Sequence, residues 1–161
     1  MRNVLSLVVS VCVVACVAPD ASDEDSQATA SSAEISEDPG VVATQVTVGP
    51  SGKVTCFGFV GTFIVGTHVQ HANWDNVGLP DECYGVAPNR TIWHAWPGHT
   101  WEVMPSGGLA DNTLPAQLIG STRRMVVFVA GPPASHWHID FPTNVPGASW
   151  GRWSQCTSGQ C

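Results

Sequence analysis

Residues 89–104 read NRTIWHAWPGHTWEVM, and they hold the clearest turn signal of the chain. Two short runs of β-branched and aromatic residues flank Pro97-Gly98, where proline presets φ for a turn and glycine tolerates a positive φ. The pattern predicts a β-hairpin with Pro97-Gly98 at its tip. Its arms carry three tryptophans, Trp93, Trp96 and Trp101. Because one tryptophan can bury on the order of 200 Å², these side chains dominate either the core or a binding surface.

Residues 43–161 are rich in glycine and proline and contain all seven tryptophans of the chain. This composition disfavours helix, and the nearest helical candidate, residues 109–119, is interrupted by Pro115. Short alternating runs indicate strands instead. The runs are 43–48, two strands within 54–69 around Gly61-Thr62, 91–96, 100–104, 123–130, 136–141 and 149–156. The sequence predicts an all-β domain, a small sandwich or barrel of about seven or eight short antiparallel strands.

The N-terminal residues have the pattern of a secretory signal. Arg2 is followed by an apolar run that begins at Val4. The run is shorter than the roughly 20 apolar residues that a membrane-spanning helix needs. We therefore expect residues 1–15 to be a signal peptide that directs export.

The signal ends in the tetrapeptide VVAC at residues 13–16, which resembles the lipobox of bacterial lipoproteins. The resemblance implies that Cys16 becomes the lipid-modified N-terminus and anchors the protein to a membrane. By the sorting tendency of that family, the resemblance implies the outer membrane in a cell with two membranes, because Val17 and not an aspartate follows the cysteine. The alternative is cleavage slightly downstream, which would release a soluble extracellular protein. The resemblance covers only this end of the chain and carries no information on the domain.

Charge is concentrated near the N-terminus. The chain has a formal net charge of −7, and seven of its acidic residues lie between residues 17 and 42. That segment has too few large apolar side chains to fold, so we expect residues 16–42 to be a disordered acidic linker. Residues 43–161 are nearly neutral, which excludes nucleic acid as a partner because phosphate binding needs a basic face. The basic pair Arg123-Arg124 is explained by a solvated strand end.

Four cysteines lie in the domain, Cys56, Cys83, Cys156 and Cys161. In an exported protein an even number predicts two disulfides, for which three connectivities exist. Pairing Cys156 with Cys161 would close a very small loop, which stabilises least in the chain-entropy model. We therefore expect each C-terminal cysteine to pair with Cys56 or Cys83. A zinc site of cysteines is typically built from Cys-x-x-Cys pairs, and the sequence has no pair with that spacing.

His136, His138 and Asp140 alternate with three apolar residues, so on a strand they share one face. Two imidazoles and a carboxylate on one face could form part of a zinc or iron site. The solvent face of a half-buried strand produces the same pattern, and this interpretation is preferred. His68-x-x-His71 is a weaker candidate that could complete such a site.

Seven tryptophans exceed what the core of a β-domain of this size needs. Surplus tryptophans on a rigid surface offer a flat apolar face for sugar rings or protein partners, and polar neighbours fix the orientation. The first candidates flank the Pro97-Gly98 turn and are Trp96, Trp101, His94 and His99. The second candidates are Trp150, Trp153 and Arg152.

These patterns favour a non-catalytic binding module for an extracellular glycan, with a surface protein as second choice and no cofactor. One alternative is a metal-dependent enzyme built on His136, His138 and Asp140. Another is a secreted inhibitor or structural envelope protein that uses the loop 105–114. Residues 147–151 match the Gly-x-Ser-x-Gly motif of α/β-hydrolases, but that motif requires a parallel α/β sheet and a later histidine.

Overall fold

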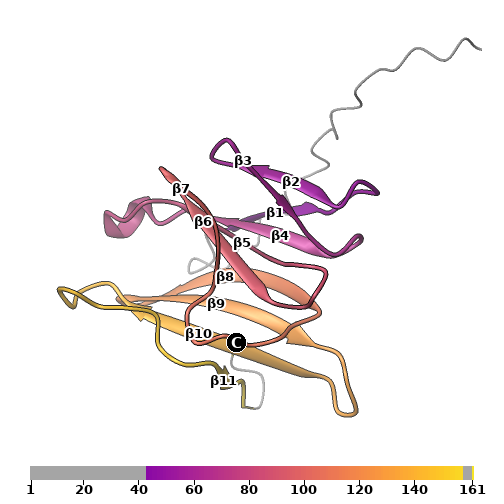
Figure 1. Ribbon diagram of the computed structural model, residues 1–161. Coiled ribbons are helices and arrows are strands. Elements are labelled where there is room, and N and C mark those ends of the chain that lie inside the picture. The colour runs from indigo at the N-terminus through magenta and orange to yellow at the C-terminus, as the bar shows by residue number, and fades with distance from the viewer. Residues whose placement is uncertain (1–42, 158–160) are drawn as a thin grey trace, which may run out of the picture.

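A computed structural model describes residues 43–157 and residue 161 (Figure 1). The predicted signal peptide, lipid attachment site and acidic linker fall on residues 1–42 and lie outside the described residues. The described part forms eleven β-strands and one short 3-10 helix, η1 (Asp75–Val77). The predicted all-β class is confirmed, with more strands than the seven or eight expected. Within this part, no helix has the length and apolar character needed to span a bilayer.

The strands form two antiparallel sheets and a separate hairpin. The five-stranded sheet has the order β1 (Ala43–Thr47), β4 (His68–Ala72), β5 (Glu82–Val86), β6 (Ile92–Trp96), β7 (His99–Val103). The four-stranded sheet has the order β11 (Ser154–Gln155), β10 (Ser135–Pro142), β9 (Thr122–Val129), β8 (Asn112–Ile119). The hairpin consists of β2 (Lys53–Cys56) and β3 (Phe59–Thr62). Figure 1 shows the five-stranded sheet between this hairpin and the other sheet, so the described strands form a sandwich and no closed barrel.

The hairpin predicted around Pro97-Gly98 is present as β6 and β7. Trp96 pairs with His99, which leaves Pro97-Gly98 as a two-residue turn in which Gly98 has a φ of 83°. Glycine adopts this positive φ without steric strain. The register of the hairpin shifts between His94 and Trp96, and such irregularities redirect side chains.

The strand β5 is buried along its whole length, because it lies in the middle of a sheet that is covered on both faces. Tyr84 and Val86 belong to the sandwich core between the two sheets, whereas Cys83 belongs to the hairpin core under β2 and β3. The sandwich core comprises Ala72, Trp74, Tyr84, Val86, Ile92, Met104, Ala110, Ala116, Met125, Val127 and Ile139. The hairpin core comprises Val48, Cys56, Phe63, Val69, Cys83, Ala95 and Trp101. A strand buried on both faces lacks the alternation that identifies strands in a sequence, so periodicity does not predict β5.

The segment 54–69 differs from the prediction of two strands around Gly61-Thr62. The first turn lies at Phe57-Gly58, between β2 and β3, and both residues have a positive φ, 51° and 85°. Two consecutive positive φ values are typical of the tightest hairpin turns. Gly61 lies within β3, where a Cβ atom would be 2.5 Å from the ring of Phe63. Close packing in the hairpin core, and not a turn, accounts for this glycine.

The strand β8 contains Pro115, the residue that breaks the helical pattern in the sequence. The register between β8 and β9 shifts between Leu114 and Gln117. Proline cannot donate a hydrogen bond to a sheet, and a bulge is one of the places that tolerate it. β8 therefore forms although it contains a proline, a residue that disfavours strands.

The disulfides join Cys56 to Cys83 and Cys156 to Cys161, so the predicted long-range pairing of the C-terminal cysteines is wrong. Cys56 ends β2, and Cys83 lies on the face of β5 that the hairpin covers, so both sulfurs meet in the hairpin core. Cys156 follows β11 at the edge of the other sheet, where Cys161 is its neighbour, with a Cα–Cα distance of 5.7 Å. Cys156 and Cys161 pair because the fold places them close together, although closing so short a loop stabilises the chain least.

The alternation predicted in the strand at 136–141 is present in β10. Ile139 is completely buried in the sandwich core, and Trp137 packs against it. His136 and His138 lie outside both cores, on the outer face of the four-stranded sheet. The inner face of β10 thus stabilises the sandwich, and its polar outer face is left for other contacts.

Candidate functional site

A cavity of about 410 Å³ lies between the two sheets, where side chains of β5, β6 and β7 meet those of β9, β10 and the segment that follows β10. Its wall is mostly apolar and consists of Leu79, Pro80, Trp96, Val103, Pro105, Phe141 and Trp150. The polar side chains on its lining are Glu82, His94, Glu102, Arg123 and Ser149. Cavities of this size and character are typical of sites for small molecules.

The floor of the cavity is a buried ionic cluster. Glu82 on β5 accepts from both neighbours: its Oε1 lies 2.5 Å from His94 Nδ1, and its Oε2 accepts a hydrogen bond from Arg123 Nη1 at 3.2 Å. Glu82, His94 and Arg123 are only 3%, 5% and 6% exposed. Since Arg123 lies on β9, the cluster ties the two sheets together at the cavity.

The guanidinium of Arg123 also holds the aromatic wall in place. Its Cζ atom lies 4.2 Å from the ring centre of Phe141 and 5.2 Å from that of Trp150. These two rings meet edge to face at 5.4 Å. Burial lowers the pKa of Arg123, and the charge of Glu82 opposes that shift. Arginine stays protonated well above neutral pH, so a permanent cation lies under the aromatic rings.

The half-buried Trp96 forms the opposite part of the wall and is held between two imidazoles. Its ring stacks on His99 with a centre-to-centre distance of 4.3 Å and tilts against His94 at 4.9 Å. The ring of His99 is half exposed and approaches Glu102 to 3.8 Å. These contacts fix the orientation of the Trp96 ring.

The structure brings together some of the predicted binding residues and separates others. Trp96, His94 and Trp150 line the cavity, and His99 supports Trp96. Three predicted residues lie outside the lining, Trp101, Trp153 and Arg152. The cavity therefore combines members of both predicted groups, the one at the Pro97-Gly98 turn and the one at residues 150–153, and leaves other members of each group outside.

Trp101 is 6% exposed in the hairpin core, and its Nε1 donates to the carbonyl of Phe59 at 3.1 Å. Trp153 packs against the sandwich core and donates to the carbonyl of Gly107 at 2.8 Å. Arg152 is exposed. Two of the tryptophans are thus structural, although their positions in the sequence do not distinguish them from Trp96 and Trp150.

Sequence reasoning misses Glu82, Arg123 and Phe141 as members of the site. The predicted solvated strand end is wrong for Arg123, because this side chain is buried in the sandwich. The one available signal is that Glu82 directly precedes residues 83–87 and Arg123 lies two residues before the apolar run 125–130, where an unpaired buried charge would be costly. A buried charge requires a partner of opposite charge, but the sequence does not identify which residue that is.

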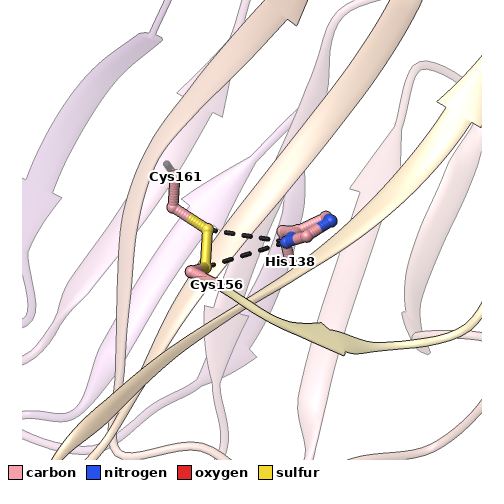
Figure 2. Close-up of side chains that lie close together, drawn as sticks. All are labelled: His138, Cys156 and Cys161. Carbon is pink, nitrogen blue, oxygen red and sulfur yellow. Dashed lines mark hydrogen bonds between the residues drawn. A yellow bond between two sulfur atoms is a disulfide. The ribbon is translucent and has the colours of Figure 1, made fainter. Parts of the chain in front are cut away.

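The predicted metal candidates share the outer face of β10 but do not converge on a point. Arg124 holds Asp140 through two hydrogen bonds of 2.8 and 2.9 Å, which raise the pKa of Arg124. His136 packs edge to face on Phe128 at 5.7 Å. His138 directs its Nδ1 toward the disulfide Cys156–Cys161 (Figure 2). His71 pairs with Asp81 at 3.3 Å, on the other sheet.

Fold and cavity define a disulfide-bonded β-sandwich with a cavity of about 410 Å³ between its sheets. The two disulfides are consistent with folding outside a reducing cytosol. No protein family model, curated protein or solved structure matches this chain. Its function is therefore inferred from the chemistry of its own residues.

Proposed function

We propose that this chain is a non-catalytic binding module that takes a carbohydrate ring into the cavity lined by Trp96 and Trp150. The observation that carries the proposal is an aromatic wall over a buried polar floor. Sugar rings have apolar C–H faces and polar edges, so they match tryptophan rings together with nearby hydrogen-bonding groups. Glu102 and the hydroxyl of Ser149 line the same cavity and are exposed, so both can meet sugar hydroxyls.

The state of Glu82 favours binding over hydrolysis. Glycosidases need two carboxyl groups that are free to donate or accept protons beside the scissile bond. Both Glu82 oxygens are already engaged, one by His94 and the other by Arg123. Glu82 and Glu102 are the two carboxylates on the cavity lining, so Glu102 has no second free carboxyl group there with which to catalyse hydrolysis.

Replacement of Trp96 by Ala is expected to weaken glycan binding about 10- to 30-fold, because central tryptophans contribute about 1.4–2 kcal/mol or more to recognition. Trp150→Ala should have a similar effect. Arg152→Ala is the matched control, since Arg152 adjoins this segment but lies outside the cavity lining. The measurement is a glycan array with the full-length chain, followed by titration with the best ligand.

Two results would contradict carbohydrate binding in this cavity. One is a wild-type chain that binds no glycan on the array, and the other is Trp96→Ala protein that binds as tightly as the wild type. Circular dichroism of each variant verifies that lost binding does not reflect lost folding. Binding to a purified surface protein without glycan binding would favour the protein-ligand alternative.

We further propose that the module acts outside the cell, anchored through Cys16 and held away from the membrane by the acidic linker 17–42. Replacing Cys16 by Ala is expected to move the protein from the membrane fraction to the soluble fraction, whereas Cys12→Ala leaves it membrane-bound. Fractionation and the mass of the mature N-terminus measure this. A mature protein that still begins with Met1 would remove the export proposal.

A further inference from the structure

A second site, separate from the cavity, lies where the C-terminal segment meets the outer face of β10. His138 Nδ1 is 3.7 Å from the sulfur of Cys156 and 3.6 Å from that of Cys161. These three atoms all lie within 4.8 Å of one another. Figure 2 shows the imidazole directed at the pair of sulfurs. The cavity side of the same strand is formed by Phe141, so the two sites do not share side chains.

The spacing of these atoms matches a tetrahedral zinc centre. Zinc bonds of about 2.3 Å to sulfur and about 2.0–2.1 Å to nitrogen place sulfur and nitrogen about 3.6 Å apart, and two sulfurs about 3.8 Å apart. The two sulfur–nitrogen distances already have this value. The sulfurs are joined as a disulfide. Cleavage of the S–S bond would let them move apart to the sulfur–sulfur distance of about 3.8 Å in a zinc centre.

We propose that reduction of the disulfide Cys156–Cys161 converts this cluster into a binding site for Zn²⁺. Two molecules of a small thiol deliver two electrons and two protons to the disulfide, giving two protein thiols and the oxidised disulfide of the reductant. Zn²⁺ then displaces both thiol protons and binds the two thiolates and the neutral imidazole of His138. A water molecule fills the fourth position.

The location of the two disulfides makes the reduction selective. Cys156 and Cys161 are five residues apart and partly exposed, beside the two-residue edge strand β11. Cys56 and Cys83 are 27 residues apart and are 8% and 2% exposed in the hairpin core. A thiol therefore reaches the C-terminal pair first, and the loop that it opens is the one whose closure constrains the chain least.

The surroundings of His138 also suit a metal ligand. Its Nε2 atom faces Asp140 Oδ2 at 3.8 Å, and Arg124 holds that carboxylate in place through two hydrogen bonds. Histidine ligands of metals commonly direct their second nitrogen to a carboxylate, which orients the ring. Asp140 thus acts here as a positioning residue and not as a ligand.

The test uses the full-length chain with Cys12→Ser and Cys16→Ser, which removes the thiols outside the domain. The chain is reduced with a water-soluble phosphine, which becomes its oxide with oxygen from water, and is then titrated with Co²⁺ as a probe for Zn²⁺. We expect one Co²⁺ per chain with thiolate-to-cobalt charge-transfer absorption, displaced by Zn²⁺, and no such absorption for the oxidised chain. Bound metal should protect Cys156 and Cys161 from alkylation.

His138→Ala is expected to weaken Zn²⁺ binding by at least about 100-fold, since it removes a ligand and even supporting residues contribute about 10- to 100-fold. His136→Ala is the matched control on the same strand face, and it should bind as the parent chain does. The proposal is overturned if the reduced chain binds no Co²⁺, if His138→Ala binds as tightly as its parent, or if Cys56 and Cys83 are the protected cysteines.

Discussion

Replacing Glu82 by Gln is expected to destabilise the protein by about 3–5 kcal/mol, because it leaves a buried arginine without its counter-charge. Glu82 is 3% exposed and Arg123 is 6% exposed. In the variant, the guanidinium keeps only the slight solvent contact of a side chain that is 6% exposed and has no carboxylate partner. The neighbouring rings of Phe141 and Trp150 stabilise the cation in part, but about 0.5–2 kcal/mol per ring does not replace a carboxylate.

Urea denaturation monitored by tryptophan fluorescence measures this loss. The control is Asp140→Asn, which breaks the pair with Arg124 on the outer face, where the Asp140 side chain is 35% exposed. A partly solvated pair is worth about 1 kcal/mol or less, so the control should lose far less stability. If both variants lose the same amount, burial is not what makes the Glu82 cluster important.

A second variant separates the charge effect from simple loss of packing. Glu82→Leu combined with Arg123→Met removes both ions and retains most of the side-chain volume. Replacing a whole buried ion pair by apolar residues is often neutral or stabilising. The double variant should therefore be more stable than Glu82→Gln, and a lower stability would show that the charges are not the cause.

Removing the disulfide Cys56–Cys83 by a double change to serine is expected to cost about 3.6 kcal/mol, from the entropy of closing a loop of 27 residues. The same change at Cys156 and Cys161 should cost about 2.1 kcal/mol, because that loop spans five residues. The difference should be larger in practice, since serine hydroxyls in the hairpin core would be buried without designed partners.

Thermal and urea unfolding of the two double-serine variants, compared with the oxidised wild type, measure both losses. The Cys156→Ser/Cys161→Ser variant serves as the matched control, since it also removes two sulfurs but lies outside both cores. Equal losses, or a greater loss from the C-terminal pair, would contradict the prediction that Cys56–Cys83 contributes more to stability than Cys156–Cys161.

The features that sequence reasoning predicts correctly depend on neighbours in the chain. The Pro97-Gly98 hairpin is one, because turn geometry is set by the φ preferences of two adjacent residues. The division of β10 into a core face with Ile139 and an outer face with His138 is another, since a strand places alternate residues on opposite sides. The all-β class follows from the repetition of such local signals.

The features that sequence reasoning misses depend on long-range packing. β5 shows no alternation because both its faces are covered, and Gly61 is explained by the ring of Phe63 in the hairpin core rather than by a turn. The candidate site was predictable only in part. His94, Trp96 and Trp150 are aromatic signals in the sequence, whereas Arg123 gains its role from Glu82, which lies 41 residues away.

By itself, the sequence determines an all-β, disulfide-forming domain with a tight Pro97-Gly98 hairpin, since these properties arise from residue types and their immediate neighbours. Only the tertiary structure decides which cysteines pair, which tryptophans line a cavity, and which charged residues are buried together. The physical reason is that burial and pairing are properties of contacts between distant segments. Trp96 and Trp101 are five positions apart on one hairpin, yet the fold places one in a cavity and the other in a core.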